Sequence, residues 1–99
     1  MSVALAYIGL GANLGDRRAQ IEGALEAMAS HGMRLVAVSP LYETEPWGVT
    51  DQPRFLNAAC AVETDLPPHD LLDALQAIER DMGRVRTVRY GPRPIDLDI

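Results

Sequence analysis

The sequence predicts an α+β domain in which an antiparallel sheet is covered by helices. Apolar residues alternate at strand spacing in some segments and recur at helical spacing in two others, with glycine or proline at the boundaries. The predicted order of elements is strand, helix, strand, strand, helix, strand. This βαββαβ order is typical of a ferredoxin-like sandwich.

The first half of the chain supplies a strand, a helix and a second strand. The first strand is predicted over residues 3–10 and ends in the glycine-rich turn GLGANLG. Asp16 is the predicted N-cap of the first helix, and Gly32 can end it. The second strand is predicted over residues 35–38. The buried face of the helix is predicted from helical spacing: Ile21, Ala24, Leu25 and Met28.

A long connection over residues 39–53 precedes the third strand, which is predicted over 55–63. Loops of this length are more often functional than structural. Pro67 and Pro68 open the second helix, Gly83 ends it, residues 87–94 form a loop, and a fourth strand begins at Ile95. The predicted buried stripe of the second helix is Leu71, Ala74, Leu75, Ile78 and Met82.

The length of 99 residues fits a single domain. Because the chain stops at Ile99 inside a predicted strand, we expect residues 1–99 to be the N-terminal portion of a fold whose C-terminal part is missing. No apolar run approaches the ~20 residues of a membrane span, and the N-terminus lacks the basic region of a signal peptide. We therefore expect a cytoplasmic protein with no membrane contact.

The charge distribution points to a local anionic ligand. The formal net charge is −5, which disfavours a nucleic-acid surface. Arg84, Arg86, Arg89 and Arg93 nevertheless fall within ten residues, and the chain contains no lysine. The single cysteine, Cys60, lies in an apolar run and is predicted to be buried rather than reactive.

The sharpest candidate site is Asp96-Leu97-Asp98. Residues two apart on a strand face the same side, about 7 Å apart, so both carboxylates would point away from a core that contains Leu97. Paired carboxylates suit Mg²⁺ ions that retain waters, and they occur in many phosphoryl-transfer sites. A bare Asp-x-Asp pair is more often a solvated strand face, and the neighbouring arginines are what favour a metal with a triphosphate.

Two common nucleotide motifs are absent. The spacing of Gly9, Gly11 and Gly15 does not match the dinucleotide-binding fingerprint, and a chain without lysine has no Walker A loop.

A second group of residues is suited to binding a planar ring. Trp47 and Phe55 offer flat apolar faces, and Asn57 can read the edge of an amide-bearing heterocycle. Phe55 in the core and Asn57 at a strand edge remain the structural alternative.

Four segments carry a resemblance to a known family. Arg89–Ile99 (RYGPRPIDLDI) resembles the signature of the 6-hydroxymethyl-7,8-dihydropterin pyrophosphokinases, also called 2-amino-4-hydroxy-6-hydroxymethyldihydropteridine diphosphokinases. AYIGLGANLGD, YETEPWGVTDQPRFLNAA and ERDMGRVR resemble the family's opening strand, pterin-binding segment and catalytic loop. The resemblance implies transfer of a diphosphate from ATP to the pterin alcohol in folate biosynthesis, with two Mg²⁺ ions and release of AMP.

The resemblance also implies residue roles. Asp96 and Asp98 would hold both metal ions, and Arg84 and Arg93 would assist catalysis from loops. The pterin pocket would be lined by Thr44, Glu45, Trp47, Phe55 and Asn57. ATP would be contacted by Gln76, Glu79, Arg86, Tyr90 and Ile99. Glu45 and Tyr90 depart from the family's usual proline and tryptophan.

Two readings from other classes stay open at this point. One is a non-catalytic ferredoxin-like module that self-associates through an unpaired edge strand. The other is an acidic metal-binding domain that uses Asp96 and Asp98 alone, without ATP. An active enzyme of the family is expected to be a monomer that binds small molecules, whereas an edge-strand dimer is the alternative for the 99-residue piece.

Overall fold

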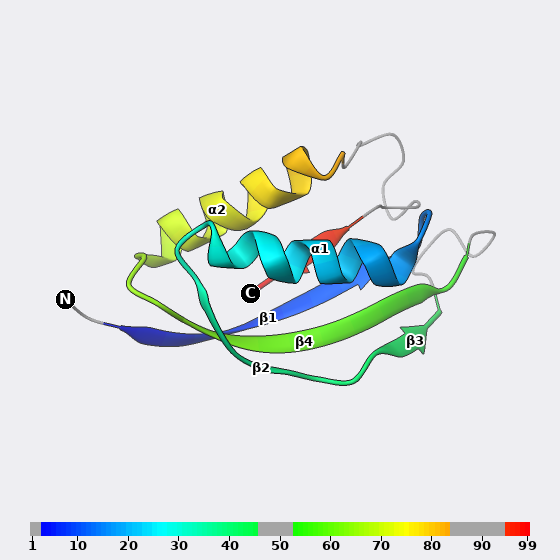
Figure 1. The fold of residues 1–99 in the computed structure, drawn as a ribbon, viewed down its shortest axis with the longest axis horizontal. Helices are drawn as coiled ribbons and strands as arrows, with labels where there is room; N and C mark the ends of the chain where they lie inside the picture. Colours follow the sequence, from blue (N-terminus) through cyan, green and yellow to red (C-terminus); the bar gives the residue numbers. More distant parts are fainter. Residues whose placement is uncertain (1–2, 46–52, 84–94) are drawn as a thin grey trace.

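The computed structural model describes residues 3–45, 53–83 and 95–99. Two helices lie on one face of a five-stranded antiparallel sheet within these residues (Figure 1). The elements are β1 (Ala4–Ala12), α1 (Arg17–Ala29), β2 (Arg34–Val38), β3 (Tyr42–Thr44), β4 (Phe55–Thr64), α2 (Pro68–Asp81) and β5 (Asp96–Asp98).

The sheet has the strand order expected of a ferredoxin-like fold. β4 and β1 lie at the centre, β2 flanks β4, and β5 flanks β1, all antiparallel to their neighbours. When β2 and β3 are counted as one interrupted edge strand, the order of the strands along the chain is 2-3-1-4 across the sheet. The predicted fold class is therefore confirmed.

The prediction of one long connection over residues 39–53 was wrong at β3. Tyr42–Thr44 pairs with Asn57–Phe55 of β4 and prolongs the edge that β2 begins. Pro40 has no N–H for a ladder bond, and the edge is interrupted there. Ser39 bridges the interruption: its backbone N–H donates to the Ala59 carbonyl at 2.8 Å, and its Oγ accepts from the Ala59 N–H at 2.8 Å.

The first strand is also longer than predicted. β1 continues through Gly9 and Gly11 to Ala12, so only residues 13–15 remain for the turn. The pairing of β1 with β4 runs without a break from Ala4 opposite Thr64 to Ala12 opposite Leu56. Gly9 and Gly11, two of the three glycines of the predicted turn, therefore lie inside the sheet, where they shape its surface.

The predicted helix boundaries are confirmed. The Asp16 side chain accepts a hydrogen bond from the Ala19 N–H at 3.1 Å, which caps α1. Gly32 and Gly83 follow the two helices with φ of +84° and +83°, a left-handed conformation that favours glycine. In the described residues neither helix is long and apolar enough to cross a membrane.

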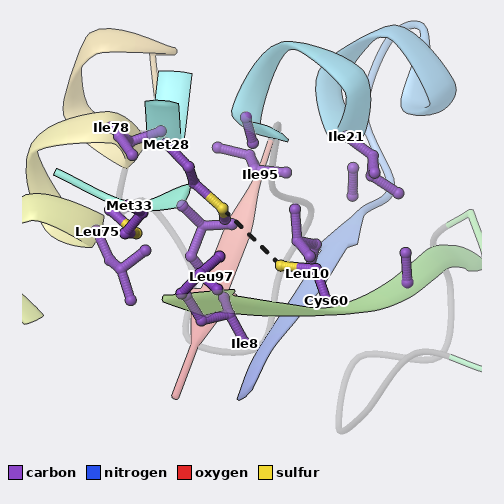
Figure 2. Close-up of a cluster of buried hydrophobic side chains, with 14 of the residues drawn as sticks. Ile8, Leu10, Ile21, Met28, Met33, Cys60, Leu75, Ile78, Ile95 and Leu97 are labelled. Carbon is purple, nitrogen blue, oxygen red and sulfur yellow. Dashed lines mark hydrogen bonds between the residues drawn. The ribbon is translucent and has the colours of Figure 1, made fainter. Parts of the chain in front are cut away.

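The core lies between the sheet and the two helices (Figure 2). Side chains from alternate positions of β1, β4 and β5 meet apolar side chains of α1 and α2 there. Cys60 is buried as predicted, with its Sγ 3.9 Å from the Met28 Sδ (Figure 2), and burial raises the pKa of its thiol. The largest fully buried apolar side chains are Ile8, Ile21, Met28, Leu75, Ile78, Ile95 and Val62.

Candidate functional site

A pocket of about 210 Å³ lies where β5, β1, β4 and β3 run side by side. It opens on the face of the sheet opposite the helices, because the residues between its lining positions, such as Leu97, point into the core. Its lining consists of Gly9, Leu10, Gly11, Tyr42, Thr44, Phe55, Asn57, Ala58, Asp96 and Asp98.

The strand register places the two predicted constellations on opposite sides of a glycine. Gly11 of β1 pairs with Asp96 of β5 on one side and with Asn57 of β4 on the other, and Asn57 pairs with Tyr42 of β3. Strands are 4.7–4.9 Å apart, so the Cα atoms of Asp96 and Asn57 are roughly 10 Å apart. Gly11 has no side chain, so no side chain of β1 stands between Asp96 and Asn57 in this row.

The two carboxylates of β5 lie on the predicted face. Leu97 is 5% exposed and packs in the core, Asp96 is half-buried and Asp98 is exposed. Asp98 stands opposite Gly9, so both carboxylates border glycine rather than a side chain of β1. The predicted alternation along this strand is confirmed.

The donor set fits an ion that keeps most of its own ligands. Among residues 3–45, 53–83 and 95–99 there is no cluster of three or more His, Cys, Asp or Glu side chains that could enclose a metal. Asp96 and Asp98 would supply carboxylate oxygens to a metal ion, and waters and phosphate oxygens would fill its other coordination positions. This arrangement is typical of Mg²⁺ at a phosphate substrate.

The opposite side of the pocket is organised around Asn57. Its Nδ2 donates to the Thr44 Oγ1 at 2.7 Å, so the amide is held by the neighbouring strand β3. Its Oδ1 lies over the backbone of Gly11, since a Cβ at Gly11 would be 3.1 Å from that atom. Phe55, half-buried, precedes Asn57 by two residues on the same face. An oriented amide beside an aromatic ring suits the edge and face of a planar heterocycle.

Four predicted ligand residues lie outside this pocket lining. Glu45 is exposed and forms an ion pair of 3.1 Å with Arg54. Gln76 is exposed on α2, and Ile99 is exposed beyond β5. Glu79 is buried, and its Oε2 accepts from the Leu97 N–H at 2.8 Å. Glu79 therefore supports the strand that carries both carboxylates, from the helix side of the sheet.

Five predicted site residues lie outside the described part of the chain. They are Trp47, Arg84, Arg86, Tyr90 and Arg93. Their assigned roles stay predictions from the resemblance.

The sequence interpretation missed five residues of the pocket lining: Gly9, Leu10, Gly11, Tyr42 and Ala58. Gly11 was assigned to the turn and Gly9 to the junction of the predicted strand with that turn, although their spacing of two residues suits one face of a strand. Tyr42 was left in a long loop, although it precedes Thr44 by two residues and shares its face. At Gly9, Gly11 and Tyr42 the alternation of a strand was present in the sequence, but neighbouring glycine or proline residues favoured the prediction of a turn or loop.

Comparisons with known proteins point to one family. Residues 7–99 match the family described as 7,8-dihydro-6-hydroxymethylpterin-pyrophosphokinase. The chain is 57% identical over 94 residues to the 2-amino-4-hydroxy-6-hydroxymethyldihydropteridine pyrophosphokinase of Pseudomonas aeruginosa, which covers 94% of this chain and 58% of that protein. It is 54% identical over 95 residues to the enzyme of the same name from Methylorubrum extorquens, covering 95% of this chain and 60% of the relative.

A longer plant protein contains a similar segment. The folate synthesis bifunctional protein of Pisum sativum, named as mitochondrial, is 55% identical over 92 residues, covering 93% of this chain and 18% of that protein. This chain thus spans about three fifths of the two bacterial relatives and a smaller share of the plant protein. The family match over residues 7–99 and these identities show that the chain belongs to the 7,8-dihydro-6-hydroxymethylpterin-pyrophosphokinase family.

Proposed function

We propose that this chain is the part of a pyrophosphokinase that holds the pterin and the metal ions while a diphosphate passes from ATP to 6-hydroxymethyl-7,8-dihydropterin. The observation that carries the proposal is the row Asp96, Gly11, Asn57 across three strands. It sets the Cα atoms of the carboxylate-bearing Asp96 and of Asn57 roughly 10 Å apart, with only a glycine between them. A pterin held at Asn57 would direct its hydroxymethyl group across Gly11 toward the carboxylates.

The proposed reaction exchanges one phosphorus–oxygen bond for another. The hydroxymethyl oxygen forms a bond to the β-phosphorus of ATP, and the bond from that phosphorus to the oxygen bridging to the α-phosphate breaks. AMP leaves with the bridging oxygen, the pterin diphosphate remains, and the hydroxyl proton is released. Two Mg²⁺ ions held by Asp96 and Asp98 would neutralise charge on the phosphate oxygens when bound.

The chain itself contributes position and shape. Thr44 orients the Asn57 amide through its hydroxyl, so the oxygen of that amide is turned over Gly11. An N–H group on the edge of a heterocycle could donate to this oxygen, and Phe55 would pack against the ring face. We assign the pterin pocket to Phe55, Asn57 and Thr44, with Glu45 and Trp47 completing it.

The remaining roles rest on the family resemblance. We propose that Gln76, Glu79, Arg86, Tyr90 and Ile99 contact ATP, and that Arg84 and Arg93 stabilise the charge that develops on the transferred group. Guanidinium groups pair well with phosphate oxygens, which supports these assignments for the three arginines. For Glu79 the contact with the Leu97 N–H supports an additional task in holding β5.

We propose a cytoplasmic monomer that binds ATP and the pterin, with no nucleic-acid or membrane partner. The net charge of −5 supports the absence of a nucleic-acid surface.

Size-exclusion chromatography tests the oligomeric state. A dimer of the 99-residue chain that is lost in a longer protein would point to pairing through an exposed strand edge.

Product analysis tests the proposed function. The 99-residue chain, and a protein that extends it to the length of its relatives, are incubated with ATP, Mg²⁺ and 6-hydroxymethyl-7,8-dihydropterin. Pterin-dependent AMP is expected at least from the longer protein. ADP as the nucleotide product, or no pterin dependence in either protein, would contradict the proposal.

A further inference from the structure

Where the backbone pairing of β1 with β4 ends, the side chain of Asn13 makes the next connection between the two segments. The last backbone pair is Ala12 opposite Leu56. The next residue of the chain, Asn13, is 1% exposed, and its Nδ2 donates to the carbonyl of Pro53 at 3.1 Å. A buried amide that donates to a carbonyl 40 residues away fixes the backbone of that segment relative to β1.

Arg17 makes a second connection from the first turn of α1 to the same segment. Its Nη1 donates to the carbonyl of Arg54 at 2.8 Å and to the Oε2 of Glu43 at 3.0 Å. Glu43 belongs to β3, between two pocket residues, whereas Arg54 immediately precedes β4. One guanidinium thus ties together the ends of the two strands that form the ring side of the pocket.

The two connections act on residues adjacent to the pocket. Pro53 and Arg54 lead directly into Phe55, and the Arg54 side chain returns to Glu45 at the end of β3 at 3.1 Å. The clamp, defined as Asn13 and Arg17, starts from the segment that follows Gly11. Its partners therefore keep a fixed position relative to the floor of the pocket and, through β1, to β5.

We propose that Asn13 and Arg17 are positioning residues for the pterin, which hold Phe55 and Asn57 at the correct distance from the carboxylates of β5. This inference rests on the proposed function of the pocket. Neither residue lines the pocket, so each acts through the backbone of residues 53–54 and, for Arg17, through Glu43. Loosening the clamp should weaken pterin binding while the ATP side is unchanged.

The test uses steady-state kinetics in a protein that extends this chain to the length of its relatives. Arg17→Ala removes both contacts, and Arg17→Lys retains a cation that can donate to one of the two oxygens. Arg18→Ala is the matched control, because Arg18 is the adjacent arginine and pairs with Glu22 on the same helix. Asn13→Ala removes the buried donor, with its melting temperature measured in parallel.

Arg17→Ala is expected to raise the KM for the pterin about tenfold, with the KM for ATP within about twofold of the parent, because each lost contact is a modest one. Arg17→Lys should recover part of the loss, and Arg18→Ala should match the parent. A merely structural role would lower the active fraction, and thus kcat, without changing the KM for the pterin.

Three outcomes would overturn the inference: an Arg17→Ala variant indistinguishable from Arg18→Ala, equal losses for pterin and ATP, or a fall in kcat alone. If Asn13→Ala does not fold, the Arg17 series decides the question. A parent protein that forms no AMP with the pterin contradicts the proposed function instead, so the two failures are distinguishable.

Discussion

Gly11 and Asn57 stand opposite each other on β1 and β4, and a Cβ at Gly11 would lie 3.1 Å from the Asn57 Oδ1 and 3.5 Å from the Phe55 Cδ1. The first separation is tighter than ordinary van der Waals contact, so a side chain at Gly11 would displace the amide oxygen. Gly11 therefore shapes the pocket because it has no Cβ, which leaves room for the Asn57 amide oxygen.

Gly11→Ala is expected to weaken pterin binding by about tenfold, because the amide oxygen must leave the position from which it would accept a hydrogen bond. Direct titration of the pterin in the absence of turnover measures this loss. Gly9→Ala adds the same methyl group two residues away, where the nearest atom among the described residues is the Asp98 backbone oxygen at 3.9 Å. A loss for Gly9→Ala as large as that for Gly11→Ala would contradict the proposed role of the amide oxygen.

Asn57→Ala is expected to reduce pterin affinity about tenfold and to leave ATP affinity unchanged. The physical reason is that Asn57 is turned by Thr44 toward the space over Gly11, whereas the ATP residues are assigned elsewhere. Isothermal titration with each ligand separately is the measurement. Equal losses for pterin and ATP would identify Asn57 as a structural residue of the sheet.

Asp96→Ala is expected to lower diphosphate transfer by more than about a hundredfold, the range found when one group that stabilises transition-state charge is removed. Asp96 is one of two described carboxylates at the pocket, so its loss halves the donor set. AMP release at saturating Mg²⁺ measures the effect, and Asp65→Ala controls for removing an exposed carboxylate outside this pocket. Turnover within about tenfold of the parent would contradict the assignment of Asp96 as a metal ligand.

The faces of the strands could be predicted from the sequence because the strand period acts locally. Leu97 between Asp96 and Asp98 is sufficient to predict one buried and two outward side chains. The neighbours of β5 could not be predicted in the same way. Gly11, rather than a larger residue, lies beside Asp96 because β1 pairs with β5. These two strands are distant in the sequence, so no local pattern shows that they pair.

β3 was not predicted because its own residues specify a strand only weakly. Tyr42–Thr44 is three residues long with an exposed residue at every position, and it follows Pro40 closely. Its structure comes from pairing with a long strand, β4, whose outer edge is already half occupied by β2. Local propensity is too weak a signal for an element of this kind.

The position of Glu79 shows a further limit of sequence reasoning. Helical spacing places Glu79 next to Leu75 and Met82, so a position on the buried side of α2 could have been predicted. The carboxylate was assigned to ATP because the family resemblance supplied that role. Its contact with the Leu97 N–H depends on how α2 lies over β5, which no local pattern encodes.

Glu79→Ala is expected to lower the free energy of unfolding by about 1–3 kcal/mol, because the buried Leu97 N–H loses its acceptor. Glu79→Gln retains an acceptor oxygen of the same reach and should lose less. Urea unfolding measures both, with Gln76→Ala as the control because Gln76 is exposed on the same helix. Equal stability of the Glu79→Ala and Gln76→Ala variants would show that the contact contributes nothing.

Cys60 should make the stability of the fold fall at alkaline pH. Its thiol is buried against Met28, and burial raises its pKa in the folded state. Above the ordinary thiol pKa of about 8.5 the unfolded chain loses this proton while the folded chain keeps it. The stabilisation is therefore complete below that pH and is lost as the pH rises through the raised pKa of the folded state.

The measurement is the difference in unfolding free energy between the parent and Cys60→Ala as a function of pH. Cys60→Ala leaves a small cavity at every pH, and its constant cost cancels when slopes are compared. In the alkaline window the parent should lose up to about 1.4 kcal/mol per pH unit more than the variant. Parallel curves for the two proteins would mean that the Cys60 thiol titrates alike in the folded and unfolded chains, as an accessible thiol would.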